Sequence, residues 1–129
     1  MAYVYEDVED LQDQPKVGSK HCVALVQLYA KTPVTGTWKQ GPLVKGNVTL
    51  KKGTAVGTFV DGRYPNNKTG NHAALYLEQD NTGIKVMDQW KDDVNKPNIS
   101  SRWIRFKGVV KGKLIEPLSN NGDAYYVID

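Results

Sequence analysis

The most constraining feature of the sequence is a pair of apolar-rich segments that a short polar turn separates. Residues 72–79 read HAALYLEQ, residues 84–90 read IKVMDQW, and the sequence DNTG lies between them. Two such segments around a turn that contains Asn and Gly predict a β-hairpin. The second half of the chain is therefore expected to build a sheet that includes this hairpin.

Three other segments are predicted to be strands of the same sheet. Residues 53–60, GTAVGTFV, are typical of a buried strand, residues 101–108 alternate in polarity, and the C-terminal AYYVID can form the last strand. The segment 61–71, DGRYPNNKTGN, is rich in turn-forming residues and is expected to be a loop.

The N-terminal third of the chain has helical rather than strand-like spacing. Val4, Val8 and Leu11 recur at i, i+4 and i+7 before Pro15, which predicts a short amphipathic helix. A second helix is expected after an N-cap at Ser19, with its end near residues 31–32. The segment 32–47 is expected to be a surface loop anchored by Trp38. Helices followed by strands predict an α+β fold, with N-terminal helices packed against a mostly antiparallel sheet.

Composition excludes several classes of protein. A chain of 129 residues with 40% hydrophobic and 24% charged residues is expected to form a single domain, 1–129, and we expect a monomer. It contains no apolar run long enough to span a membrane, and its acidic N-terminus does not resemble a signal peptide, so we expect synthesis in the cytoplasm and no membrane partner. The net charge of +3 comes with scattered lysines, which favours solubility over nucleic-acid binding.

A single cysteine, Cys22, excludes an internal disulfide, and with only His21 and His72 beside it a structural zinc site is not expected. No cofactor is predicted. A lone cysteine in a helix is more often a small core residue than a catalyst. Cys22, however, lies near the start of the second predicted helix, where unpaired N–H groups and the helix dipole favour a thiolate. Both interpretations of Cys22 stay open on this segment alone.

A cysteine nucleophile needs a base, and His72 is the better of the two histidines. His21 is adjacent to Cys22, and consecutive helical residues do not face each other. His72 opens a predicted strand directly after the turn-rich loop. Asp88 or Gln89, on the return strand of the hairpin, is near enough in register to orient its ring. The carboxylate is the better partner for an imidazolium, but sequence alone leaves the choice between them open.

The segments GSKHCVALVQLYA, KKGTAVGTF, GNHAALYLEQDNTGIKVMDQW and SRWIRF resemble the papain-like superfamily of cell-wall amidases, which includes CHAP domains and NlpC-type peptidases. Within it, the chain is most similar to the small type VI secretion amidase effectors, in particular their second family and its relatives. The resemblance implies Cys22 as nucleophile, His72 as general base and Asp88 as the orienting group. Relatives often carry Gln before the cysteine, where this chain has His21, whose role the resemblance leaves unassigned.

The resemblance further implies an antibacterial toxin, delivered to the periplasm of a target cell, that hydrolyses amide bonds in peptidoglycan stems or cross-links. It also implies an immunity protein in the producing cell. Because stem peptides carry carboxylates, Lys39, Lys45 and Arg63 are candidate substrate-binding residues. Two alternatives remain: a papain-like protease or deamidase that acts on a protein or small amide, and a non-catalytic binding module with Cys22 in its core.

Overall fold

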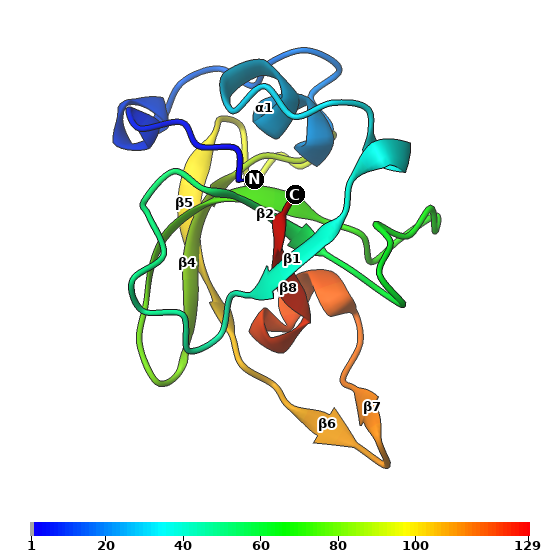
Figure 1. Ribbon diagram of the computed structural model, residues 1–129. Helices are drawn as coiled ribbons and strands as arrows, with labels where there is room; N and C mark the ends of the chain where they lie inside the picture. The colour runs from blue at the N-terminus through cyan, green and yellow to red at the C-terminus, as the bar shows by residue number, and fades with distance from the viewer. Residues whose placement is uncertain (1) are drawn as a thin grey trace.

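The computed structural model describes residues 2–129 and has one α-helix packed on one six-stranded antiparallel sheet (Figure 1). The strand order is β1-β8-β2-β3-β4-β5, and a separate two-stranded hairpin, β6-β7, projects from the body. The elements are α1 (Cys22–Tyr29), β1 (Gln40–Leu43), β2 (Ala55–Thr58), β3 (Ala73–Gln79), β4 (Gly83–Asp88), β5 (Ser100–Arg105), β6 (Val109–Val110), β7 (Lys113–Leu114) and β8 (Tyr125–Ile128). Short 3₁₀ helices cover Val8–Leu11, Thr35–Thr37, Leu118–Asn120 and Gly122–Ala124. The predicted α+β class is confirmed.

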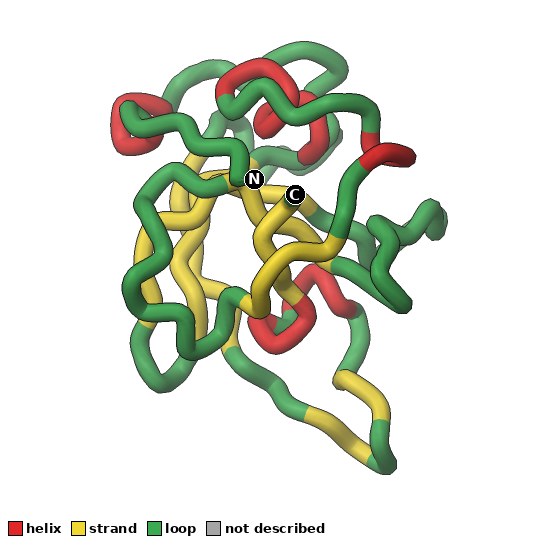
Figure 2. The backbone as a smooth tube through the Cα atoms, in the orientation of Figure 1, coloured by secondary structure: helices red, strands yellow, loops and turns green. Residues whose placement is uncertain are grey.

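Side chains on the two faces of the sheet belong to two separate hydrophobic clusters. Successive residues of a strand point to opposite faces, so on β3 Leu75 packs with α1 and Ala74 packs into the other cluster. The first cluster includes Leu25 and Val26 of α1, and the second includes Tyr125 of β8. The backbone of the sheet is strongly curved, and the helical segments gather mainly at one end of the molecule (Figure 2).

The strand predictions at 53–60, in the hairpin, at 101–108 and at the C-terminus are confirmed as β2, β3-β4, β5 and β8. The loop 32–47 also contains a strand that was not predicted, β1. Its sequence Gln-Gly-Pro-Leu lacks strand character, but β1 is an edge strand, where Pro is tolerated because one side needs no N–H donor. Trp38 is buried as expected, and its Nε1 donates to the Pro33 carbonyl at 2.9 Å.

The predicted first helix is wrong, because only Val8–Leu11 form a single 3₁₀ turn. The backbone on either side of this turn is held by other segments instead. Tyr5 N–H donates to the Gly53 carbonyl at 2.9 Å, and Asp13 N–H donates to the Ile99 carbonyl at 2.8 Å. These tertiary hydrogen bonds replace the helical ones, while Val8 and Leu11 still enter the core.

The predicted bounds of the second helix are also wrong. The N-cap is His21 rather than Ser19, so Cys22 is the first helical residue, and the helix ends at Tyr29. Gly18 and Lys20 both have positive φ, which turns the chain sharply just before the helix. None of the helices within residues 2–129 is long and apolar enough to cross a membrane.

Candidate active site

Cys22 occupies the first position of α1 and is only partly buried. Leu25 and Val26, about one turn further along the helix, belong to the core cluster against the sheet, whereas the Cys22 Sγ lies 3.9 Å from the Tyr64 hydroxyl. The helix thus anchors itself through its apolar side chains and presents the thiol at its N-terminal end. There the N–H groups of the first turn have no intrahelical acceptor.

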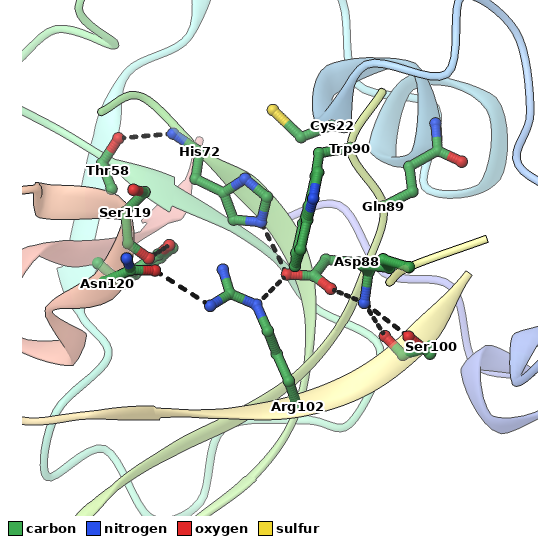
Figure 3. Close-up of polar contacts among 12 residues, drawn as sticks. Cys22, Thr58, His72, Asp88, Gln89, Trp90, Ser100, Arg102, Ser119 and Asn120 are labelled. Carbon is green, nitrogen blue, oxygen red and sulfur yellow. Dashed lines mark hydrogen bonds and ion pairs between the residues drawn. The ribbon is translucent and has the colours of Figure 1, made fainter. Parts of the chain in front are cut away.

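His72 immediately precedes β3 and is buried. Its backbone is fixed from both sides, because its N–H donates to Thr58 Oγ1 at 3.1 Å and its carbonyl accepts from Thr58 N–H at 3.0 Å. Its Nε2 lies 2.8 Å from Asp88 Oδ2, and a dashed line marks this contact in Figure 3. The remaining ring nitrogen, Nδ1, is therefore the one left for the thiol of Cys22.

The register of the hairpin decides which residue faces His72. Leu75 pairs with Met87 and Tyr76 with Val86, so Asp88 lies opposite Ala74, which shares a strand face with His72. Nearer the turn, Glu78 pairs with Lys85, and a bulge between Tyr76 and Glu78 shifts the register by one residue. Without this bulge, Gln89 rather than Asp88 would face His72.

Gln89 points to the opposite face and contacts the chain before α1. Its Oε1 accepts from Val17 N–H at 2.9 Å, and its Nε2 donates to the carbonyls of Val17 and His21 at 3.1 and 2.8 Å. Gln89 is fully buried. Its amide thus holds the turn that leads into Cys22, rather than the ring of His72.

Asp88 is fully buried among three cationic or ionisable partners. Besides His72, Lys96 Nζ lies 2.7 Å from its Oδ1. Arg102 Nε lies 2.7 Å from its Oδ2, and Figure 3 shows Arg102 beside Asp88. Burial raises the pKa of the Asp88 carboxyl, but the hydrogen bond and charge of His72 and the charges of Arg102 and Lys96 outweigh burial and hold this pKa far below its usual range. Asp88 is therefore a permanent anion beside the imidazole.

Sequence reasoning missed both Lys96 and Arg102. Arg102 lies on β5 opposite Val86, on the same face as Asp88, so the alternation of residues 100–105 contained a signal for it. Lys96 lies outside the strands and has no such periodicity. Both cations also lie over the ring of Trp90, at 4.6 Å for Lys96 Nζ and 5.0 Å for Arg102 Cζ.

Cys22 and His72 stabilise each other's charged forms, which lowers the pKa of the thiol and raises the pKa of the imidazole. Burial raises the pKa of the Cys22 thiol, but the hydrogen bond and charge of His72, with the Ala73 N–H and the Tyr64 hydroxyl, outweigh it and leave this pKa below its ordinary value. Burial lowers the pKa of His72, but Asp88 and Cys22 outweigh burial and raise it to about 9. The environment therefore favours a thiolate and an imidazolium together, which is the activated form of a cysteine nucleophile.

The three cations predicted to bind substrate separate into two groups. Lys39 and Arg63 line a cavity of about 980 Å³ together with Trp38 and Tyr64, so this cavity reaches the residue that contacts Cys22. Lys45 instead donates to Asp123 at 2.8 Å, and its ammonium lies over the ring of Phe106.

A second cavity, of about 570 Å³, is lined in part by His72 and by residues 68–71 of the loop between β2 and β3. Its lining includes His21, Lys68, His72, Trp90 and Arg102. His21 thus borders the same cavity as His72, while its carbonyl accepts a hydrogen bond from Gln89 Nε2. Within residues 2–129, no group of three or more His, Cys, Asp and Glu side chains is arranged to hold a metal ion.

Comparisons with known proteins find relatives along nearly the whole chain. Residues 5–128 match the family described as domesticated amidase effector 2. A "Type VI secretion amidase effector 2 protein" of Salmonella typhi is 49% identical over 134 residues, which cover 100% of both chains. The "Domesticated amidase effector 2" of Ixodes scapularis is 35% identical over 117 residues, or 88% of this chain and 73% of that one. A solved structure of type 6 secretion amidase effector 2 has a TM-score of 0.91 and 46% identity, and the match covers 98% of this chain and 94% of that one.

Proposed function

Because the chain belongs to the family of the type VI secretion and domesticated amidase effectors 2, we propose that it is an antibacterial cysteine amidase. Its substrate is an amide bond in the peptide stems or cross-links of bacterial peptidoglycan, and residues 1–129 act as one catalytic domain. One observation carries the proposal: a partly exposed thiol interacts with a buried imidazole, whose Nε2 lies 2.8 Å from a fully buried carboxylate. This order of nucleophile, base and orienting group is typical of nucleophilic catalysis.

In the proposed reaction Cys22 attacks the carbonyl carbon of the scissile amide as a thiolate. The backbone N–H of Cys22, at the first position of α1, donates to the oxyanion that forms. The imidazolium of His72 then gives its proton to the leaving amine, the C–N bond breaks and a thioester remains on Cys22. Water, deprotonated by the now neutral His72, hydrolyses the thioester and restores the thiolate–imidazolium pair.

Asp88 acts on this reaction through His72. Its carboxylate accepts from Nε2–H, which keeps Nδ1 toward Cys22 and stabilises the positive charge of the ring. Lys96 and Arg102 keep Asp88 ionised and fixed in position, because each lies 2.7 Å from one of its oxygens. Asp88, rather than Gln89, is therefore the proposed orienting group.

The cavity of about 980 Å³ beside Tyr64 is the proposed site for the acidic peptide stem. Lys39 and Arg63 line it and supply positive charge for stem carboxylates. We leave Lys45 out of this proposal, because its ammonium already pairs with Asp123.

The proposed place of action is the periplasm of a target bacterium, because peptidoglycan lies there and one relative is named a type VI secretion effector. The producing cell then needs an immunity protein, and the cavities lined by Tyr64 and by His72 are the surfaces that such a protein would occlude. No nucleic acid or cofactor enters the proposal.

Digestion of purified sacculi tests the function directly. Wild-type protein should release fragments with new free amino and carboxyl groups, and Cys22→Ala should release none. Expression directed to the periplasm of a Gram-negative host should cause lysis, whereas cytoplasmic expression and periplasmic Cys22→Ala should not. Unchanged muropeptides after prolonged digestion would reject the cell-wall substrate and favour an amidase acting on a protein or small amide. Lysis by Cys22→Ala would reject a cysteine mechanism.

A further inference from the structure

The ring of Tyr64 packs against two other aromatic rings, which hold it beside the Cys22 thiol. The ring lies 4.7 Å from that of Trp38 at an interplanar angle of 62°, and 6.4 Å from that of Phe59 at 75°. Trp38 and Phe59 are both buried, and the indole of Trp38 is itself fixed by its bond to the Pro33 carbonyl. Edge-to-face packing of this kind leaves the ring little freedom. The Tyr64 hydroxyl is thus held in place before any substrate arrives.

This hydroxyl lies at the distance that a donor to the tetrahedral intermediate requires. In that intermediate the oxyanion is bonded to the carbon that is itself bonded to Sγ, so the oxyanion lies within a few ångströms of the sulfur. The Tyr64 Oη is 3.9 Å from Sγ. A group at this distance can approach the oxyanion to the donor distance of about 2.7–3.1 Å typical of an oxyanion hole.

Tyr64 and His72, which both interact with Cys22, line different cavities. Tyr64 lines the cavity of about 980 Å³ with Trp38, whereas His72 lines the cavity of about 570 Å³ with Trp90. A proton donor to the leaving amine and a donor to the oxyanion have to act on different substituents of the same carbon. Tyr64 and His72 are two separate groups that interact with Cys22 and line different cavities, as this requirement demands.

We propose that the hydroxyl of Tyr64 is a catalytic hydrogen-bond donor, which stabilises the oxyanion together with the backbone N–H of Cys22. This role rests on the proposed function. When the thiolate adds to the amide carbonyl, the π electron pair moves to oxygen, and Tyr64 donates a hydrogen bond to it without transferring its proton. When the intermediate collapses, the pair returns, the C–N bond breaks and the amine takes its proton from His72.

The chemical state of Tyr64 fits a donor. Burial, and then the negative charge of the Cys22 thiolate, raise the pKa of the Tyr64 hydroxyl well above its ordinary value. The phenol therefore still carries its proton at the pH at which the Cys22 thiol loses its own. Before substrate binds, the same hydroxyl contributes to the lowered pKa of Cys22, so the test has to separate these two effects.

Tyr64→Phe removes the hydroxyl and keeps the ring that Trp38 and Phe59 hold. On a peptidoglycan fragment, kcat should fall about 10²-fold with little change in KM, as expected for loss of one oxyanion donor. The rate of alkylation of Cys22 by iodoacetamide should fall far less than kcat, because displacement at a saturated carbon forms no oxyanion. Its pH dependence should shift only slightly upward, since Tyr64 makes the smallest of the contributions that lower the pKa of Cys22. A peptide aldehyde, which forms a tetrahedral adduct with the thiol, should bind more weakly to the variant than to wild type.

The matched control is Tyr126→Phe, since the ring of Tyr126 packs on the same Phe59 at 6.2 Å. This control should keep wild-type kcat, and both variants should keep the wild-type thermal midpoint. Wild-type kcat in Tyr64→Phe would overturn the assignment. So would equal losses of kcat and alkylation rate, because they would show that Tyr64 acts on the thiolate alone. Cys22→Ala, assayed in parallel, separates the outcomes: its activity would reject the proposed function itself, whereas an inactive Cys22→Ala beside a fully active Tyr64→Phe would reject only the role of Tyr64.

Discussion

Replacing Asp88 by Asn tests whether this carboxylate creates the reactive thiolate. The change keeps the shape and a hydrogen-bond acceptor for His72 Nε2, but removes the negative charge 2.8 Å from the ring. The pKa of His72, about 9 against an ordinary 6.5, corresponds to a preference of about 3 kcal/mol, or about 300-fold, for the imidazolium. Asp88 provides the largest part of this preference, and burial opposes it.

In Asp88→Asn, His72 should therefore be neutral near pH 7, and Cys22 should lose the cation that lowers its pKa. The rate of alkylation by iodoacetamide, measured by mass spectrometry from pH 5 to 10, reports the thiolate fraction. At about pH 6.5 the variant should react at least ~10-fold more slowly than wild type, since each tenfold change corresponds to about 1.4 kcal/mol. Hydrolysis of peptidoglycan fragments should fall in parallel.

Asp92→Asn is the matched control for charge. Asp92 is exposed and has a φ of 63°, a conformation that Asn adopts readily, so its alkylation profile should match wild type. Asp88→Asn also leaves Lys96 and Arg102 without their carboxylate, which should cost up to about 3–5 kcal/mol of stability. Alkylation is therefore measured well below the thermal midpoint of the variant. Coincident alkylation profiles of wild type and Asp88→Asn would refute the role of Asp88.

Three further changes follow from the same contacts. Gln89→Leu should reduce thermal stability and kcat together, because the Val17 N–H and carbonyl before Cys22 both lose their partner atoms on Gln89, at about 1–3 kcal/mol for each group left unpaired; wild-type values for both would contradict this. Lys96→Met should raise the pKa of His72 further, since Asp88 loses one competing cation, and the alkaline limb of the pH–rate profile should move upward. In Cys22→Ser, the free energy of unfolding should fall as pH rises above about 6.5, by at most about 1.4 kcal/mol per pH unit, because native His72, still beside Asp88, keeps a proton that the unfolded ring loses. The fall should end below pH 9, since the Cys22 thiolate no longer helps to raise the pKa of His72. Wild type should show a flatter dependence in denaturant titrations at several pH values, because its native thiolate lacks a proton that the unfolded thiol keeps.

Most strands of the sheet were predictable because their sequences are apolar or alternate in polarity, as strand residues do, and are bounded by turn residues. Residues 72–79 and 84–90 became β3 and β4, and the full-length relatives confirm the resemblance to the second family of type VI secretion amidase effectors. The failures lie where tertiary hydrogen bonds replace local preference. The predicted helix before Pro15 gives way to pairing of its backbone with distant segments, and β1 is held as an edge strand despite its Gly-Pro sequence.

The residues of the candidate site also divide into those that the sequence predicted and those that it did not. Cys22 and His72 were predictable because each occupies an end of an element, where a polar side chain can face a cavity. Lys96 and Tyr64 lie outside regular elements and have no periodic signal. Their positions beside Asp88 and Cys22 result from contacts between segments far apart in the chain.

The sequence by itself determined that a hairpin carries His72 on one strand and an acid and an amide on the other, with a single thiol near a helix start. Only the tertiary structure decided that Asp88 faces His72 while Gln89 holds the turn before Cys22. The physical reason is the bulge between Tyr76 and Glu78. Because strand side chains alternate with a period of two, this one-residue shift exchanges the faces of the two neighbours.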